Sequence, residues 1–597
     1  MKQFWITFFG SVVGVIVGSV LAVILLIFMI GALIGSAMQN VEAEAPGLPD
    51  EPMILELDLR EPRIDQPSRS PFAYAEPLAI TEIVMTLQRA ADDDRVAGVF
   101  VRANEFGMSP GQAEELRAAF ARFSESGKFV LAHAQGFEAT TVTNYFAVGG
   151  VDELWLQDTA NFAATGLAVE TPFLGGLFEQ FDAVPQFLQF HEYKNAANTY
   201  TESDYTEAHR EATLSYLGSI LDSAVAGLAD DRGMDAETLT TLIETGPRSA
   251  EQALEAGLID RLGHVVAARE AARERAGDES ASFVEIERYA RAAPRGGRGS
   301  GPVVALVGGQ GPIVTGDGDG GFGGGEMIGG DRMAQAIQNA VDDDSVRAII
   351  LRVDSPGGSA IASDQVWDAV IRAREAGKPV IVSMASVAAS GGYYISAPAD
   401  LIVANATTIT GSIGMLAGKI VIDGTLDNVG MNIEPLHVGG DYTLAWSAQQ
   451  EWTEAQREAF YTLAEDVYED FTERVADGRD LPLERVQEIA RGRVWTGAQA
   501  HELGLVDRIG GLYEAVEAAR EIAGIDPDEA IRVRAFPSRP TPLEAFRELF
   551  GVTAESAEAA ARLNALMQTP GVREAIRMRE QAARPGVSLY AGEEQPR

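Results

Sequence analysis

The chain of 597 residues contains no cysteine. Disulfide bonds, thiolate nucleophiles and cysteine-ligated metal sites are therefore excluded, whichever redox compartment the protein occupies. Histidine is scarce as well, because the chain has only six, and none lies in a motif typical of a Ser-His-Asp triad.

Basic residues are also few. Lys and Arg number 47 against 88 Asp and Glu, so the formal net charge is −41. A phosphate backbone binds to an excess of positive charge, and we therefore expect no nucleic acid partner. The acidic residues are spread along the chain, which is typical of a strongly solvated surface.

Charge is absent altogether from residues 3–40. A membrane-spanning helix needs about 20 consecutive apolar residues, whereas the apolar part of a cleaved signal peptide has roughly 7–15. The apolar run 4–37 therefore predicts one transmembrane anchor over residues 1–41. Lys2 precedes the run and acidic residues follow it, which indicates a cytoplasmic N-terminus and a body outside the cytoplasm.

The remainder of the chain is duplicated. Five blocks of the first half recur 247 to 250 residues later: 92–96 at 342–346, 127–128 at 377–378, Asp152 at Asp400, 206–212 at 453–459, and 257–263 at 504–510. A period this long indicates two related domains rather than a solenoid. We predict a first copy at 52–288, a second at 302–535 and a C-terminal tail at 536–597.

Each copy alternates short apolar strands with helical patterns. In the second copy we expect strands at 303–307, 348–353, 380–384 and 401–403, with helices at 332–342, 362–376 and 388–397. The first copy has matching strands at 53–59, 96–102, 129–132 and 153–156. This order predicts an α/β fold with a largely parallel sheet covered by helices.

Two segments of the second copy could carry chemistry. Residues 352–359 read Arg-Val-Asp-Ser-Pro-Gly-Gly-Ser, a strand-to-helix turn in which glycines let backbone N–H groups approach a ligand. Ser390 opens the second segment, and the N–H groups of Gly358 and Gly391 could form an oxyanion hole beside it. A serine at the start of a helix and beside glycines, as Ser390 is, is also typical of a helix cap or of a small residue packed in the core.

A nucleophilic serine needs a base, and lysine is the alternative to histidine. A lysine base must be neutral, so its pKa must fall by roughly three units, which requires a buried and largely apolar pocket. Lys419 lies in a short apolar stretch 29 residues after Ser390 and is one candidate.

Four motifs together resemble signal peptide peptidase A in its long, duplicated bacterial form. They are Asp-Ser-Pro-Gly-Gly at 354–358, Ala-Ser-Gly-Gly-Tyr-Tyr at 389–394, Thr-Gly-Ser-Ile-Gly at 410–414 and Val-Trp-Thr-Gly at 494–497. The resemblance implies tandem domains of the crotonase and Clp-protease type, built from repeated ββα units, and a Ser-Lys dyad. Short members of that family place the lysine about fifty residues after the serine, but here Asp441 and Tyr442 stand at that distance.

The repeat supplies the missing lysine. Lys194 of the first copy corresponds to Asp441 or Tyr442, while the first copy has Thr140, Thr141 or Val142 where the second has Ser390. One copy therefore holds the nucleophile and the other the base, as the long form of the family implies.

The resemblance carries further expectations. Ser412 corresponds to the family's serine that orients the lysine amine, and neither a metal nor an organic cofactor is implied. The family's activity predicts hydrolysis of hydrophobic peptides such as signal peptide remnants, by a homotetramer on the outer face of the bacterial inner membrane. Two alternatives remain: an enoyl-CoA hydratase or isomerase on the same scaffold, and a membrane scaffold without catalysis.

Overall fold

The computed structural model of the chain describes residues 47–68, 76–103, 107–137, 141–292, 301–318, 326–527 and 529–538. The expected transmembrane anchor at 1–41 lies outside these residues, as does the C-terminal tail beyond residue 538. Within them, one helix, α7 (Glu207–Arg232), is long and apolar enough to cross a membrane by length and composition alone. Four of its residues belong to the first hydrophobic core, namely Ala224, Val225, Leu228 and Ala229.

The first copy is built around a parallel six-stranded sheet in the order β8-β4-β3-β2-β1-β9. Its strands are β1 (Met53–Asp58), β2 (Val96–Arg102), β3 (Phe129–Ala134), β4 (Glu153–Leu156), β8 (Arg261–Leu262) and β9 (Ser282–Glu285). Outside this sheet lie β5 (Asn161–Phe162), β6 (Val184–Phe190) and β7 (Arg248–Ser249). The helices are α2 (Ile80–Ala91), α3 (Pro110–Glu125), α4 (Val142–Val148), α5 (Gly175–Gln180), η2 (Asn195–Ala197), α6 (Asn198–Thr201), α7 (Glu207–Arg232), α8 (Ala236–Glu244), α9 (Ala250–Glu255), α10 (Val265–Arg275) and α11 (Ile286–Ala292).

The second copy repeats this plan in an eight-stranded sheet. The order is β18-β16-β14-β13-β10-β20; β15 also pairs with β14, and β19 pairs with β15. Its strands are β10 (Val303–Gln310), β13 (Val346–Ser355), β14 (Val380–Ala389), β15 (Leu401–Ala404), β16 (Ile409–Gly411), β18 (Val494–Thr496), β19 (Arg508–Ile509) and β20 (Arg532–Phe536), while β11 (Ile313–Val314), β12 (Ile328–Gly329) and β17 (Met415–Val421) lie outside the sheet. The helices are α12 (Gly330–Asp342), α13 (Ala360–Glu375), α14 (Gly391–Ser396), α15 (Asp423–Asn428), α16 (Glu454–Arg479), α17 (Leu483–Ile489), α18 (Gly497–Glu502) and α19 (Leu512–Ile522).

Helices cover both faces of each sheet, as the alternating pattern predicts. In the second copy, apolar side chains of α12, α13 and α14 form one core against the strands, and those of α19 form the other. The predicted helix at 388–397 is the main difference, because residues 388 and 389 extend β14 and the helix begins only at Gly391. Ala388 and Ala389 pair with Thr410 and Gly411 of β16, and these contacts favour a strand there.

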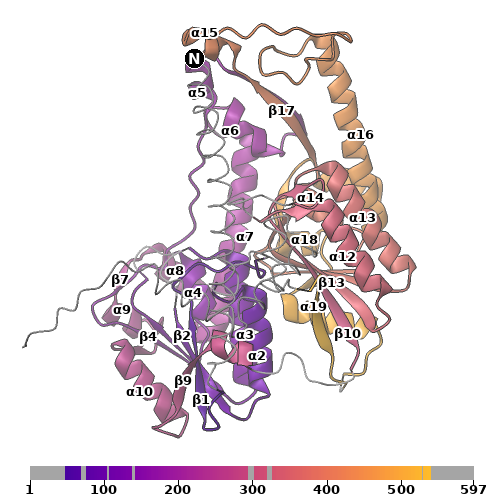
Figure 1. Cartoon of the computed structure of the whole chain (residues 1–597). Helices are drawn as coiled ribbons and strands as arrows, with labels where there is room; N and C mark the ends of the chain where they lie inside the picture. Colours follow the sequence, from indigo (N-terminus) through magenta and orange to yellow (C-terminus); the bar gives the residue numbers. More distant parts are fainter. Residues whose placement is uncertain are drawn as a thin grey trace, which may run out of the picture.

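Several contacts tie the two copies together, and two of them bear on the site (Figure 1). At one end, β6 of the first copy and β17 of the second form an antiparallel ribbon that lies near α5 and α15. Between the sheets, α3 of the first copy packs against β14. Glu114 on α3 accepts the backbone N–H groups of Ala406 and Thr407 at 3.0 and 2.9 Å.

A buried charge cluster lies in this second contact. The Arg352 guanidinium donates to Asp65 at 3.0 and 2.5 Å, to Glu115 at 2.7 Å and to Ser383 Oγ at 2.8 Å. Asp65 and Glu115 come from the first copy, and all three charged side chains are 3% exposed or less. The cluster therefore anchors β13, the strand that leads into the Asp-Ser-Pro-Gly-Gly motif, to the other copy.

Replacing Arg352 with Met should destabilise the protein by about 3–5 kcal/mol, because Asp65 and Glu115 would be left buried without a counter-charge. Thermal and denaturant unfolding measure the change. Arg372→Met is the matched control, since Arg372 pairs with Asp368 on the surface of α13 and such a pair contributes about 0–1 kcal/mol. Equal losses in the two variants would contradict the prediction.

Candidate active site

Ser390 lies at the sharp turn between β14 and α14. Its backbone has φ of 53° and ψ of −119°, which is unusual for a residue with a side chain, and such strain costs about 1–3 kcal/mol. The turn is held because the Ser390 N–H donates to Gly411 O at 2.8 Å and its carbonyl accepts from Tyr394 N at 2.9 Å. A serine on a strained strand-to-helix turn presents its Oγ outward, as in the nucleophile elbow of many hydrolases.

The Gly357-Gly358 loop packs directly against this turn. Gly357 has φ of 102°, and a Cβ there would lie 2.6 Å from Gly391 N and 2.7 Å from Ser390 Cβ. Only glycine allows this approach. A Cβ on Gly391 would in turn lie 3.2 Å from Gly358 N. Neither the Gly358 N–H nor the Gly391 N–H donates to another described residue, so both are free to bind an oxygen beside Ser390.

Asp354 joins these two loops, and sequence reasoning gave it no role. The register of β13 against β14 shifts between Val353 and Ser355. At this break, Asp354 Oδ1 accepts the Val387 N–H at 3.0 Å, and burial raises the pKa of the carboxyl to about 6. The carboxylate therefore holds the strand that ends in Ser390 against the strand that leads into Gly357.

Lys194 reaches the serine from the other copy. Its Nζ lies 3.0 Å from Ser390 Oγ, and it lies 2.7 Å from Ser412 O and 3.0 Å from Ser412 Oγ. The residue is 7% exposed. The structure thus brings together all five residues predicted for the site, two of which are separated by 196 positions in the chain.

Two contacts between the copies position the lysine. Phe190, the last residue of β6, pairs with Met415 of β17, and Lys194 follows four residues later. On the other side, a Cβ on Gly492 would lie 2.6 Å from Lys194 N and Cβ, so the left-handed Gly492, with φ of 80°, lets the second copy close over the lysine backbone. Ser412, at φ of 52°, is held in turn by its N–H donating to Arg493 O at 2.7 Å.

The site changes the protonation of this lysine. Desolvation of the buried amine lowers the pKa of Lys194 from 10.5 to about 7. A carboxylate nearby would favour the charged ammonium and oppose the shift. Two hydroxyl oxygens and one carbonyl surround the amine instead, so a large fraction of Lys194 is neutral near pH 7.

Other candidate residues lie elsewhere. The rival base Lys419 donates its Nζ to the carbonyls of Ala445, Ser447 and Gln450 at 2.9, 3.1 and 2.6 Å, and thereby braces the β17 region. His133 is buried in the first copy, where desolvation lowers its pKa to about 4. Among the described residues, no group of three His, Asp or Glu side chains is arranged to hold a metal ion.

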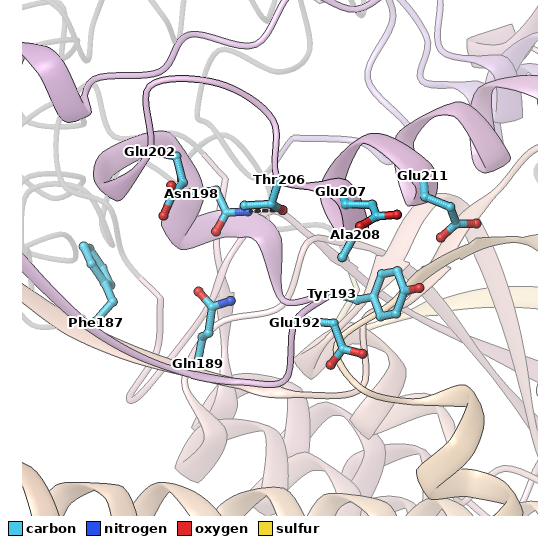
Figure 2. A pocket seen from close by; sticks show the side chains of 10 residues that line it. All are labelled: Phe187, Gln189, Glu192, Tyr193, Asn198, Glu202, Thr206, Glu207, Ala208 and Glu211. Atoms are coloured by element: carbon cyan, nitrogen blue, oxygen red, sulfur yellow. Dashed lines mark hydrogen bonds between the residues drawn. The ribbon is translucent and has the colours of Figure 1, made fainter.

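A cavity of about 780 Å³ opens on the outer side of the lysine loop (Figure 2). Glu192 and Tyr193, which precede Lys194, line it together with Phe187 and Gln189 of β6. Neither Ser390 nor Lys194 is part of its lining. The Ser390 and Lys194 side chains therefore lie beside this cavity and not within it.

Comparisons with known proteins agree with this chemistry. Residues 122–278 and 372–526 match the model of peptidase family S49, one match in each copy. The chain is 30% identical over 460 residues to a chloroplastic serine protease SPPA of Arabidopsis thaliana, covering 75% of this chain and 66% of that protein. It is 29% identical to Protease 4 of Haemophilus influenzae (76% and 74% covered) and to Protease 4 of Salmonella typhi (74% and 72%).

These matches define a serine-type peptidase with a mixed α/β fold and two tandem domains of one kind. The chain belongs to peptidase family S49.

The lowered pKa of Lys194 has a consequence for stability. Between pH 7 and 10.5 the folded protein binds fewer protons at this group than the unfolded chain, so the free energy of unfolding rises with pH across that window. Lys194→Met removes the buried amine. We therefore expect the gain in the free energy of unfolding to be about 2–3 kcal/mol larger at pH 6 than at pH 9. Denaturant unfolding at both pH values measures this difference, and equal gains would contradict it.

Proposed function

We propose that the protein is a membrane-anchored endopeptidase that hydrolyses hydrophobic peptides, including signal peptide remnants, through a dyad of Ser390 and Lys194. One observation carries the proposal: a buried amine, with no carboxylate beside it among the described residues, lies 3.0 Å from the hydroxyl of a serine on a strained turn. This is the arrangement that an amine needs to act as a general base near neutral pH.

In the first step, neutral Lys194 takes the proton of Ser390 Oγ as the oxygen attacks the peptide carbonyl. The amine keeps two N–H bonds for Ser412 O and Ser412 Oγ, which aims its lone pair at Ser390. The carbonyl oxygen becomes an oxyanion and accepts the N–H groups of Gly358 and Gly391. The Lys194 ammonium then donates its proton to the leaving amine, and the C–N bond breaks.

In the second step, water hydrolyses the acyl-enzyme. Lys194, neutral again, takes a proton from water as its oxygen attacks the ester carbonyl, and the same two N–H groups hold the second oxyanion. The ammonium returns that proton to Ser390 Oγ as the ester bond breaks. The cycle uses protein groups and water, and we propose no metal or organic cofactor.

The setting of the enzyme is part of the proposal. The uncharged run 4–37 supports a single membrane anchor, and the charges on either side of it support a catalytic body on the outer face of a bacterial inner membrane. We propose hydrophobic peptides as substrates because such an anchor keeps the enzyme where these peptides are left. The largely parallel sheets, with paired glycines after a central strand, support the crotonase and Clp-protease type of fold. The family resemblance supports a homotetramer.

The two alternative functions find less support. Membership of a peptidase family argues against an enoyl-CoA hydratase or isomerase. A scaffold without catalysis has no use for a desolvated lysine beside a strained serine, since both features cost stability.

Ser390→Ala and Lys194→Met should each lower hydrolysis of a hydrophobic peptide ester by at least about 10³-fold, because each removes one half of the proposed dyad. Lys419→Met is the matched control and should retain most of the activity, since Lys419 contacts carbonyls away from Ser390. Rates are measured on variants with wild-type circular dichroism. Full activity of Lys194→Met would overturn the dyad, and an inactive wild type would overturn the peptidase function.

The pH dependence should follow the lysine. kcat/KM is expected to rise about tenfold per pH unit below 7 and to level off above it, since only neutral Lys194 can accept the serine proton. In Ser412→Ala the Lys194 ammonium loses one hydrogen-bond acceptor, which lowers the pKa of the amine. The inflection of the kcat/KM profile should therefore move to lower pH, and its plateau should fall. A profile that falls as pH rises through 7 would show that the charged form is the active one.

A further inference from the structure

The cavity beside the lysine loop takes no part in the proposed dyad, yet its size suits a ligand. Its volume of about 780 Å³ lies within the roughly 300–1,000 Å³ that is typical of ligand pockets. No lysine or arginine is among the residues that line it, whereas four of them are glutamates. The four are Glu192, Glu202, Glu207 and Glu211 (Figure 2). The wall of this cavity is therefore acidic.

Arginines outside the cavity neutralise two of the four carboxylates. Arg491 donates two hydrogen bonds of 2.9 Å to the Glu192 carboxylate. Arg493 donates two hydrogen bonds of 2.7 Å to the Glu211 carboxylate. Paired contacts of this kind between a guanidinium and a carboxylate are strong and fix the geometry of both groups. These two glutamates therefore have little charge left to offer a ligand.

The other two carboxylates have no cation beside them. The Glu202 carboxylate, which follows α6, accepts the hydroxyl of the neighbouring Thr201 at 3.2 Å, and Glu207 is the first residue of α7. Neither glutamate forms an ion pair within the described ranges of the chain. The N-terminus of α7 carries about half a positive charge. Two whole negative charges outweigh this half charge, so the cavity attracts a cation.

A buried side-chain oxygen also faces the cavity without a partner. Asn198 lines the cavity and is only 3% exposed. Its amide nitrogen makes long contacts, to Asn195 Oδ1 at 3.5 Å and to Thr206 Oγ1 at 3.4 Å, and its Oδ1 accepts no hydrogen bond from the described residues. Figure 2 shows the Asn198 side chain pointing from α6 toward Gln189 on the opposite wall. A buried acceptor of this kind is satisfied when a ligand supplies a donor.

The acceptors suit an organic cation better than a metal ion. Within the part of the chain that the structure describes, no three carboxylate or histidine groups are close enough to ligate one metal. The rings of Phe187 and Tyr193 line the same cavity. Aromatic surfaces pack against the apolar stem of a lysine or arginine side chain and attract its charge. A basic side chain therefore satisfies the two free carboxylates, the Asn198 oxygen and the aromatic wall together.

We propose that this cavity is a specificity subsite that binds a lysine or arginine side chain of the peptide substrate. The inference rests on the proposed function and narrows its substrates to peptides with a positive charge beside an apolar stretch. Signal peptides have this composition, since a positively charged n-region precedes roughly 7–15 apolar residues. Tyr193 lines the cavity and directly precedes Lys194. The charge therefore lies within about four residues of the scissile bond, because an extended chain spans at most about 3.3–3.6 Å per residue.

Matched peptides separate this recognition from the general acidity of the chain. An internally quenched apolar peptide carries one arginine, moved from about four residues before the scissile bond to about four after it, and its partner carries neutral citrulline of nearly the same shape. The wild type should have a kcat/KM at least about tenfold higher for arginine at one or two positions, since a charged hydrogen bond forms there. A ratio near one everywhere, or one raised equally at all positions, would overturn the subsite.

Neutral substitutions test the two free carboxylates. In the double variant Glu202→Gln, Glu207→Gln the ratio of arginine to citrulline kcat/KM should fall below about threefold, because the ligand charge loses its counter-charges. Glu237→Gln, Glu244→Gln is the matched control, since both residues are exposed on α8, lie outside the cavity lining and change the net charge equally. The control should keep the wild-type ratio. An unchanged ratio in the first variant, or an equal fall in both, would contradict the assignment.

Charge reversal gives a readout that a loss of structure does not imitate. The double variant Glu202→Lys, Glu207→Lys should prefer a peptide with glutamate to one with glutamine, at the position where the wild type prefers arginine. A variant that hydrolyses both peptides equally well would show that these two side chains do not contact the substrate.

Binding separates this inference from the catalytic proposal. Full-length Ser390→Ala, purified in detergent, should bind a labelled arginine peptide about tenfold more tightly than the citrulline peptide in fluorescence anisotropy. Equal affinities would overturn the subsite, whether or not the wild type hydrolyses either peptide. A wild type that binds the arginine peptide preferentially but hydrolyses neither would overturn the catalytic proposal and leave the subsite supported.

Discussion

Desolvation of the Lys194 ammonium is the constraint on which the rest of the arrangement depends. An amine at its ordinary pKa of 10.5 is charged at neutral pH and cannot accept a proton, whereas burial brings this one to about 7. Burial is costly, and neither copy supplies it alone. The first copy provides the lysine, and the Ser412 turn and Gly492 of the second close around it. The pairing of β6 with β17 is therefore a requirement of the proposed chemistry as well as of the fold.

A second constraint acts on the serine side. Ser390 sits in a strained backbone conformation, and strain persists only where the surrounding structure holds it. Here it is held by the Ser390–Gly411 hydrogen bond, the Gly357 loop and the Asp354 carboxylate. Arg352, two residues before Asp354, is fixed by Asp65 and Glu115 of the first copy. The first copy thus supports both members of the proposed dyad, although it has no serine at the position that corresponds to Ser390.

Much of this organisation follows from the sequence. The strands of both copies, the helix patterns, Ser390 and the two glycines are visible in apolar periodicity and glycine placement. Lys194 needed the family resemblance together with the repeat register, and Ser412 needed the resemblance alone. The chain has five lysines, and Lys128 and Lys378 stand at equivalent positions where each Nζ donates to backbone carbonyls, which leaves few candidates for a base. The contacts between copies could not be predicted, because no local pattern says that β6 pairs with β17 or that Arg352 meets Asp65. The start of α14 was misjudged for a related reason, since pairing of Ala388 and Ala389 with β16 extends the strand at the expense of the helix.

Duplication followed by loss also explains why the two copies differ around the site. Within the described residues, β6 of the first copy pairs with β17 of the second, while residues 432–438, which follow α15 as β6 follows α5, lie in no strand. The internal contact kept the lysine on its donating side and the serine on its receiving side, while residues 432–442 and the region around Thr141 kept neither. Because a desolvated lysine and a strained serine both cost stability, a copy that keeps only one of the two carries a smaller cost than a copy that keeps both.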